Sequence, residues 1–137
     1  LKPFQFCNLT EVNVSNIESQ EDLSKRVKLA ALLGTLQASF TDFHYLRPIW
    51  KQITEKDALI GVGMTGIGSG TILKYDLNNA AEMACNANKY YSKLLKINQA
   101  ARVTTIKPSG TTSCVLGTSS GIKKVHLNYL HELNYLI

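Results

Sequence analysis

Residues 58–66, with the sequence ALIGVGMTG, decide the fold of this chain. The segment is apolar, carries no charge and is bounded by glycines, and its length suits a β-strand that is buried on both faces. Such strands occur in parallel sheets and in barrels, where helices cover the sheet. The segment therefore predicts a parallel α/β arrangement in which the neighbouring sequence supplies the helices and the remaining strands.

The sequence before this segment is expected to hold one strand and two helices. Residues 1–17 are expected to be extended, because valines alternate with polar residues over 11–15. Ser19, followed by acidic residues, is typical of a helix start, and apolar residues recur at helical spacing from there to about residue 43. Pro48 marks a break, after which residues 49–55 are expected to form a short helix.

The sequence after the segment continues the alternation. Asp76 is expected to cap a long helix with an alanine-rich face that ends near residue 94. The β-branched residues 102–106 are expected to form a strand, which runs into a turn-rich and hydroxyl-rich loop at 107–113. The order of strand, helix, strand, helix, strand and loop predicts crossover connections between parallel strands, although the strands are too few to close a barrel.

Length and composition describe one globular domain. The chain has 137 residues, of which 45% are hydrophobic and 18% are charged, a balance unlike that of disordered segments. It contains no apolar run long enough to cross a membrane, and its first residues lack the pattern of a signal peptide. The net charge of +5 comes from scattered basic residues without interleaved aromatic side chains, so neither a nucleic-acid partner nor a membrane is expected.

Three cysteines at wide spacing, Cys7, Cys85 and Cys114, form no disulfide or metal-ligand pattern. This usage fits a reducing, cytoplasmic environment, and no metal site is expected. Cys85 and Cys114 are interpreted as small core residues. By its apolar neighbours alone, Cys7 also fits an inert buried residue better than a reactive one.

The loop at 107–113 has the composition of a phosphate-binding loop. It follows a strand, contains a glycine that lets a ligand approach the backbone, and offers several hydroxyl groups. A polar surface loop explains the same composition equally well, although a second such stretch at 117–121 favours the phosphate interpretation. The GxGxxG spacing at 61–66 is a weaker signal, because its glycines lie inside the apolar run, and tight packing of a helix on the strand explains them better.

Four segments resemble the adenosylcobalamin-dependent, class II ribonucleotide reductases. Residues 6–13, FCNLTEVN, resemble the segment with the second cysteine of the family's active-site pair, and residues 58–66 resemble a glycine-rich barrel strand. Residues 102–113 and 115–122 are similar to the family's substrate-phosphate region. The forms CNLTE and KPSGTT are most similar to the monomeric, triphosphate-reducing branch.

The resemblance implies a fold and an activity. Residues 1–122 are expected to be part of a ten-stranded α/β barrel, and residues 123–137 are a divergent tail of unknown origin. The implied activity is the reduction of ribonucleoside triphosphates to 2′-deoxyribonucleotides by thiyl-radical chemistry with adenosylcobalamin. Cys7 matches one redox-active cysteine, which a thioredoxin-type reductant recycles. The matched phosphate-binding loop consists of Pro108, Ser109, Gly110, Thr111, Thr112 and Ser113.

Parts of the family's machinery are missing from this sequence. The Asn-Pro-Cys-Gly-Glu segment, with the radical cysteine and a catalytic carboxylate, is expected just before Leu1, and the partner of Cys7 is expected further upstream. The chain is therefore expected to be an inactive fragment that works with the remainder of the reductase chain. Two alternatives stay open: a non-catalytic nucleotide-binding remnant, and a piece that complements a separately encoded chain.

Overall fold

A computed structural model describes residues 1–123 of the chain. The expected divergent tail therefore lies, from residue 124 onward, outside the described residues. The elements of the described residues follow one another as β1 (Asn8–Asn13), α1 (Gln20–Ala38), α2 (Pro48–Asp57), β2 (Ile60–Thr65), two 3₁₀ helices (Ile67–Ser69 and Thr71–Lys74), α3 (Leu77–Leu95) and α4 (Gly110–Leu116). None of the helices in residues 1–123 is both long and apolar enough to cross a membrane.

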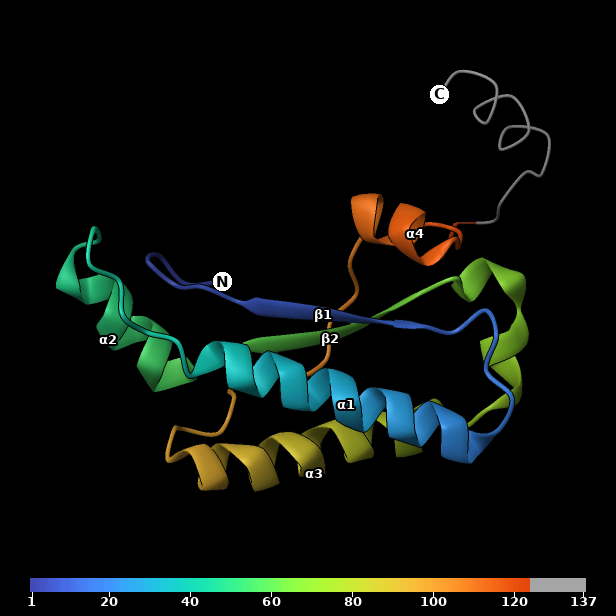
Figure 1. The fold of residues 1–137 in the computed structure, drawn as a ribbon, viewed down its shortest axis with the longest axis horizontal. Helices are drawn as coiled ribbons and strands as arrows, with labels where there is room; N and C mark the ends of the chain where they lie inside the picture. The colour runs from blue at the N-terminus through green and yellow to red at the C-terminus, as the bar shows by residue number, and fades with distance from the viewer. Residues whose placement is uncertain (124–137) are drawn as a thin grey trace, which may run out of the picture.

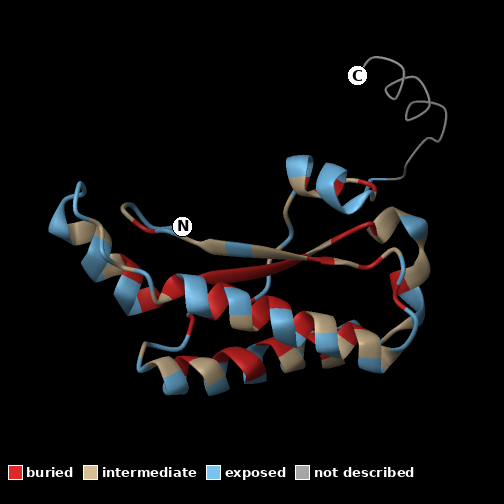
Figure 2. Ribbon diagram, viewed as in Figure 1, coloured by how far each residue is buried: buried red, intermediate tan, exposed pale blue. Residues whose placement is uncertain are grey.

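The predicted parallel pairing of the first two strands is confirmed. β1 and β2 run in the same direction, with Asn8 opposite Ile60 and Asn13 opposite Thr65. The connection between them passes through α1, which lies across one face of the pair, and α3 packs beside α1 on the same side (Figure 1). β2 is buried over almost its whole length, as its apolar sequence predicts, whereas β1 is only partly buried (Figure 2).

The third expected strand is reduced to a single parallel bridge between Val62 and Thr104. The backbone of residues 102–105 follows β2 through hydrogen bonds, one of which joins the Val62 N–H to the Val103 carbonyl at 2.8 Å. No strand within residues 1–123 pairs with the outer edge of this segment, and β-branched residues alone do not complete a ladder. The sheet of the described residues is therefore two-stranded, and they do not form the ten strands of the expected barrel.

Both predicted caps begin the long helices. The side chains of Ser19 and Asp76 accept hydrogen bonds from backbone N–H groups in the first turns of α1 and α3, at 3.1 and 3.0 Å. The helix expected after Pro48 is α2. α1 ends at Ala38 rather than near residue 43. Beyond this end Phe40 is 69% exposed, and Phe43 packs on Phe6, with ring centroids 5.1 Å apart.

The core lies between the helices and the strands. α1 lies close to β2 at Gly34, where an added Cβ would lie 3.3 Å from the Cβ of Ile60. The buried Asn88 of α3 donates a hydrogen bond to the Thr35 hydroxyl of α1 at 2.9 Å, so the two helices share a satisfied polar contact. α3 turns small side chains inward, at Ala80, Ala84 and Ala87. This packing places both long helices on one face of the sheet, while α4 lies on the other side of the strands (Figure 1).

Candidate active site

The face of the sheet that α1 and α3 leave free carries the residues singled out from the sequence. Side chains alternate between the two faces of a strand, so Leu9 and Glu11 of β1 point to the same side. Their partners in the register are Gly61 and Gly63 of β2. Because glycines have no side chain, this face has space over β2 for residues from the neighbouring segments.

Side chains from both neighbours occupy that space. A Cβ on Gly61 would lie 2.5 Å from Leu9 Cδ2 and 2.9 Å from Thr105 Cγ2, and a Cβ on Gly63 would lie 3.2 Å from Lys107 Cγ. The expectation that these glycines serve helix packing is therefore wrong. The close contact between helix and strand is made by a glycine on the helix, and the glycines of β2 admit side chains on the opposite face.

A buried carboxylate lies beside the expected phosphate loop. The Glu11 side chain is 1% exposed, and its Oε2 lies 3.4 Å from Lys107 Nζ. Its Oε1 accepts a hydrogen bond from the Ser109 hydroxyl. Buried charges persist in proteins where they are paired in this way. Neither Glu11 nor Lys107 is predicted from the sequence as a site residue. Glu11 occupies an alternating polar position in β1, and Lys107 covers the face of the sheet to which that position points.

The expected loop ends in a short helix. Ser109 lies in the left-handed backbone region, with φ of +56°, which costs a non-glycine residue about 1–2 kcal/mol. α4 begins directly after it, so the second half of the predicted loop is helical. The Ser113 N–H donates to the Ser109 carbonyl at 3.1 Å. The N–H groups of Gly110, Thr111 and Thr112, which precede it, have no acceptor within the helix.

The four hydroxyl groups of the loop are not equivalent. Ser109 and Ser113 are buried, and their hydroxyls donate within the chain, to Glu11 and to the Gly110 carbonyl respectively, the latter at 2.7 Å. Thr111 is exposed and Thr112 is half-buried. The accessible donors of the loop are therefore the threonine hydroxyls and the first backbone N–H groups of α4.

The second hydroxyl-rich stretch packs against the first. The Ser120 hydroxyl donates to the Pro108 carbonyl. On the other side, the Thr65 hydroxyl at the end of β2 donates to the Ser119 carbonyl at 2.9 Å and lies 3.1 Å from the Thr118 hydroxyl. Residues 117–121 thus connect the loop to the end of β2, and the two stretches are adjacent in space as well as in sequence.

Cys7 precedes β1 directly, at the end of the strand away from the loop. Phe6 packs on Trp50 of α2, with ring centroids 4.8 Å apart. The alternation of side chains along β1, extended by one residue, predicts that Cys7 faces the same side as Glu11. About 13 Å of extended strand separates these two residues. The Cys7 thiol is half-buried, and burial raises its pKa, so it is protonated at neutral pH.

The other two cysteines lie elsewhere. Cys85 on α3 and Cys114 on α4 are both exposed, so their interpretation as core residues is wrong. The reason on α3 is that the inward face is already filled by alanines. Within residues 1–123, no group of three or more histidine, cysteine, aspartate or glutamate residues is placed to hold a metal ion.

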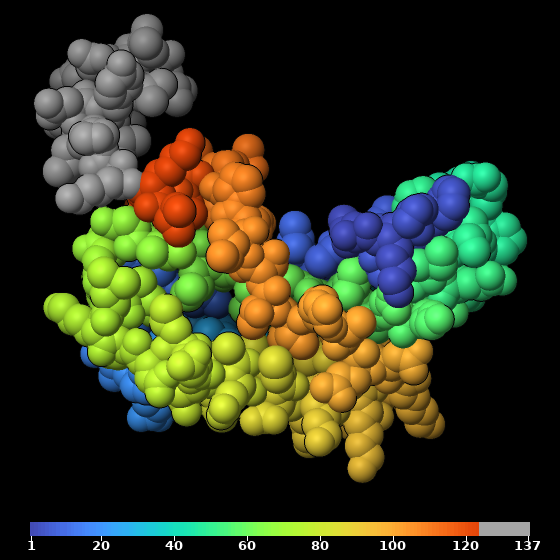
Figure 3. Space-filling model, turned by 180° about the vertical axis from the view of Figure 1, so that it is seen from behind, coloured from blue at the N-terminus to red at the C-terminus, as the bar shows by residue number. Residues whose placement is uncertain are grey.

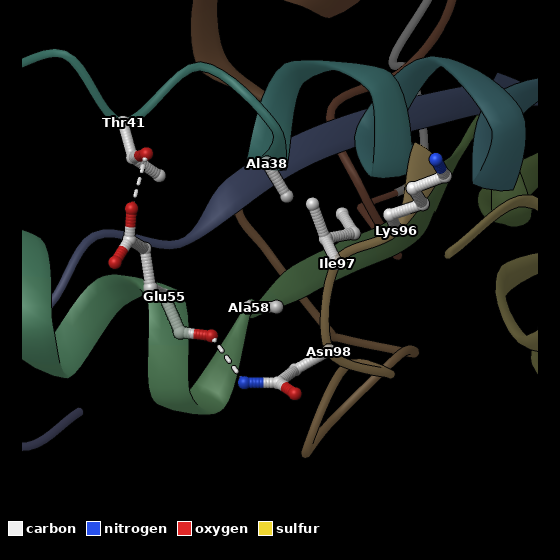
Figure 4. A pocket seen from close by; sticks show the side chains of 7 residues that line it. All are labelled: Ala38, Thr41, Glu55, Ala58, Lys96, Ile97 and Asn98. Carbon is white, nitrogen blue, oxygen red and sulfur yellow. Dashed lines mark hydrogen bonds between the residues drawn. The ribbon is translucent and has the colours of Figure 1, made fainter. Parts of the chain in front are cut away.

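A separate pocket of about 250 Å³ lies near the start of β2, between the ends of α1, α2 and α3 (Figure 4). Its polar groups bond to one another. The Thr41 hydroxyl donates to the Glu55 carboxylate at 2.7 Å, and the Asn98 amide donates to the Glu55 carbonyl at 2.9 Å. Because Ala38 and Ile97 of the helical layer line it, this pocket does not belong to the face that carries Glu11 and the loop.

The fold is that of a segment of a class II ribonucleotide reductase. A crystal structure of a B12-dependent (class II) ribonucleotide reductase superimposes on this chain with a TM-score of 0.72 at 24% identity, and the match covers 88% of this chain and 21% of that chain. The mixed α/β class predicted from the sequence is therefore confirmed. The match covers about a fifth of that protein, and the ten-stranded barrel expected from the sequence is not shown for the described residues.

Curated relatives agree with the structural match. The chain is 30% identical to the adenosylcobalamin-dependent ribonucleoside-triphosphate reductase of Lactobacillus acidophilus, over 96% of this chain and 21% of the relative. It is also 30% identical to a probable adenosylcobalamin-dependent ribonucleoside-triphosphate reductase of Dictyostelium discoideum, over 89% of this chain and 16% of the relative. No family model matches the chain. The resemblance to the triphosphate-reducing branch is thus confirmed, and the chain spans about a fifth of the length of these relatives or less.

Proposed function

We propose that this chain is a segment of an enzyme that reduces ribonucleoside triphosphates to 2′-deoxyribonucleotides with adenosylcobalamin. The observation that carries the proposal is that the loop at 108–113 contacts β1 at Glu11 and that Cys7 directly precedes β1, in a chain similar over 96% of its length to a reductase of that name. A ribonucleotide that lies along β1 with its phosphates at the loop has its sugar toward Cys7.

The loop would bind the phosphates. Its backbone N–H groups at Gly110, Thr111 and Thr112, which have no acceptor within α4, and the two accessible threonine hydroxyls are donors that suit phosphate oxygens. The hydroxyls of Ser109 and Ser113 are engaged within the chain, so these serines would contribute through the shape of the loop. Pro108 contributes its carbonyl to the contact with the second loop.

Cys7 would be one member of the reducing pair. In the proposed reaction two thiols give two electrons and two protons, hydrogen replaces the 2′-hydroxyl, water leaves, and the two sulfurs join in a disulfide. A thioredoxin-type dithiol then opens the disulfide by exchange and is itself oxidised. Cys85 and Cys114 lie on α3 and α4, so the partner of Cys7 comes from residues outside 1–123.

Four pockets among residues 1–123 are too small to hold adenosylcobalamin. Their volumes are about 250 to 380 Å³, which suit a small ligand and not a corrin with its adenosyl group and nucleotide tail. His44 is exposed and pairs with Asp42 at 3.1 Å. In the proposed enzyme the cofactor supplies the radical that starts the reaction, and the remainder of the chain supplies its site.

Exposed apolar surfaces support a larger assembly. On α1, Leu29, Leu33 and Leu36 are between 41% and 56% exposed, and the first two line a groove of about 380 Å³ beside β1. At the opposite edge of the sheet, a hollow of about 310 Å³ opens between the start of α3 and residues 104–106. Figure 3 shows this hollow beside the orange segment. Further strands and helices of the same reductase chain would cover both surfaces. The proposed location of the assembled reductase is the cytoplasm.

The same surfaces also favour the alternative that a separately encoded chain supplies these elements. Purification of the natural gene product under native conditions separates the two cases. A single polypeptide several times longer than 137 residues supports the first, and a stoichiometric second chain supports the alternative.

The test of the redox assignment is Cys7→Ser in the natural gene product that contains this segment. The variant is expected to form well under one deoxynucleotide per chain with a dithiol reductant, because one remaining thiol cannot supply the two electrons and close a disulfide. Cys85→Ser, at an exposed position on α3, is the matched control and should retain repeated turnover. Repeated turnover by Cys7→Ser would contradict the role of Cys7.

A further inference from the structure

Glu11 has an unusual position for a carboxylate. Its side chain is almost fully buried in β1, it pairs with Lys107, and its Oε1 accepts the Ser109 hydroxyl across 98 positions of sequence. Its other oxygen, Oε2, accepts no hydrogen bond from any described residue. Burial of a charge is unfavourable unless its partners are fixed, so this carboxylate holds the parts that contact it in defined places.

The part that it holds most directly is the turn of the phosphate loop. Ser109 is 1% exposed, and its backbone lies in the left-handed region. A serine keeps this backbone conformation only where the surroundings impose it. The hydrogen bond to Glu11 anchors the side chain of this one residue to β1. The backbone on its C-terminal side is α4, so the orientation of Ser109 sets the direction of the N–H groups that follow it.

Lys107 is held on the same carboxylate by the shape of β2. Its side-chain stem passes over Gly63, where a Cβ would lie 3.2 Å from its Cγ, and its ammonium group reaches Glu11 on the next strand. The loop therefore has a fixed residue on each side of Pro108, one at Lys107 and one at Ser109, and both converge on Glu11.

We propose that Glu11 is a positioning residue for the phosphate-binding loop, acting through Ser109 and Lys107 rather than by contact with the nucleotide. The inference rests on the proposed function of that loop and deepens it. Its consequence is that Ser109 serves binding through its hydrogen bond to Glu11, and not by donating its hydroxyl to phosphate.

The test is a double-mutant cycle between Glu11→Ala and Ser109→Ala in the natural gene product, with KM and kcat measured for a ribonucleoside triphosphate. Each single variant is expected to raise KM about tenfold with kcat changed less than about twofold, since the loop binds the ground state and the transition state alike. The double variant is expected to be no worse than Glu11→Ala alone, because Glu11→Ala already removes the hydrogen bond that Ser109→Ala removes. Additive effects, or an unchanged KM in Ser109→Ala, would overturn the proposal.

Two further variants separate positioning from general damage. Glu11→Gln keeps an oxygen that accepts the Ser109 hydroxyl, and its KM is expected to stay within about threefold of the unmodified enzyme. Glu18→Gln, at an exposed glutamate, is the matched control and should change nothing. If Glu11→Ala does not fold, Ser109→Ala and Glu11→Gln still decide the question, and a Glu11→Gln variant as poor as Ser109→Ala contradicts an acceptor role.

The failure of this inference is distinct from the failure of the proposed function. If replacing Gly110 by valine, which crowds the phosphate, raises KM but removing the Glu11–Ser109 contact does not, then the loop binds phosphate and Glu11 does not position it. If neither change affects KM, the phosphate loop itself is wrongly assigned, and the positioning role fails with it.

Discussion

Replacing Gly110 by valine is expected to weaken the binding of a ribonucleoside triphosphate while it leaves the fold intact. No atom of residues 1–123 lies within 4 Å of a Cβ built on Gly110, and its φ is not positive. The position is therefore open in this structure, and the added methyl groups point into space that no described residue fills. The neighbouring N–H groups are the donors that the proposal assigns to phosphate.

The two expected magnitudes differ clearly. For folding, valine at the start of a short helix changes the free energy of unfolding by less than about 0.5 kcal/mol, which moves Tm by no more than about 2 °C in a chain of this size. For binding, the loss of one charge-assisted hydrogen bond costs about 1.5–3 kcal/mol, which is roughly 10- to 150-fold in Kd. Gly110→Ala adds a single carbon and should fall between glycine and valine.

The assay is a titration of the isotope-labelled chain with CTP or with inorganic tripolyphosphate, followed by the NMR signals of individual amides. The signals of 110–112 are expected to move in the unmodified chain, and the Gly110→Val chain should need at least about tenfold more ligand for half of its shift. Equal affinity in both chains would refute the loop assignment. A fall in Tm of more than about 5 °C would instead refute the open environment of Gly110.

Three further predictions concern the strand face and the titrating groups. Gly61→Ala should destabilise the chain by about 1–3 kcal/mol in urea unfolding, because its Cβ would lie 2.5 Å from Leu9 Cδ2. Combining it with Leu9→Ala should recover part of the lost stability. An unchanged stability in Gly61→Ala contradicts the packing. With the other cysteines replaced by serine, iodoacetamide should react with Cys7 at a higher midpoint pH in the folded chain than in urea, since burial raises its pKa; equal midpoints contradict its burial. The pKa of Asp57 is lowered, mainly by its hydrogen bond from Lys2, below the usual 3.8. Its contribution to stability is therefore present above that value and is lost as pH falls through the lowered pKa, so Asp57→Asn should flatten this part of the acid unfolding curve, and an unchanged curve contradicts the pairing.

Local signals in the sequence predict the elements that they specify directly. Ser19 and Asp76 precede helices whose first N–H groups need acceptors, so each cap can be read from a few neighbouring residues. The apolar run that became β2 has no polar face and fits only a doubly covered strand. The extended segment at 102–106 is predicted less well, because its ladder depends on neighbours that the residues 1–123 do not provide.

The features that the sequence could not predict depend on contacts between residues that are far apart in the chain. The Ser109 hydroxyl is a plausible phosphate donor by composition, and only the folded chain places it on Glu11, 98 positions away. The glycines of β2 fit a helix contact by spacing alone, and the register with β1 decides which face they occupy. Cys85 has the apolar character of a core residue, yet the alanines of α3 take the inward face.

The most direct measurement is the formation of deoxynucleotides by the purified natural gene product that contains this segment. The product of a ribonucleoside triphosphate and a dithiol reductant is quantified with and without adenosylcobalamin. We expect 2′-deoxyribonucleoside triphosphate to form over many turnovers only when adenosylcobalamin is present. An intact gene product that binds the cofactor and the triphosphate but forms no deoxynucleotide would contradict the proposed function.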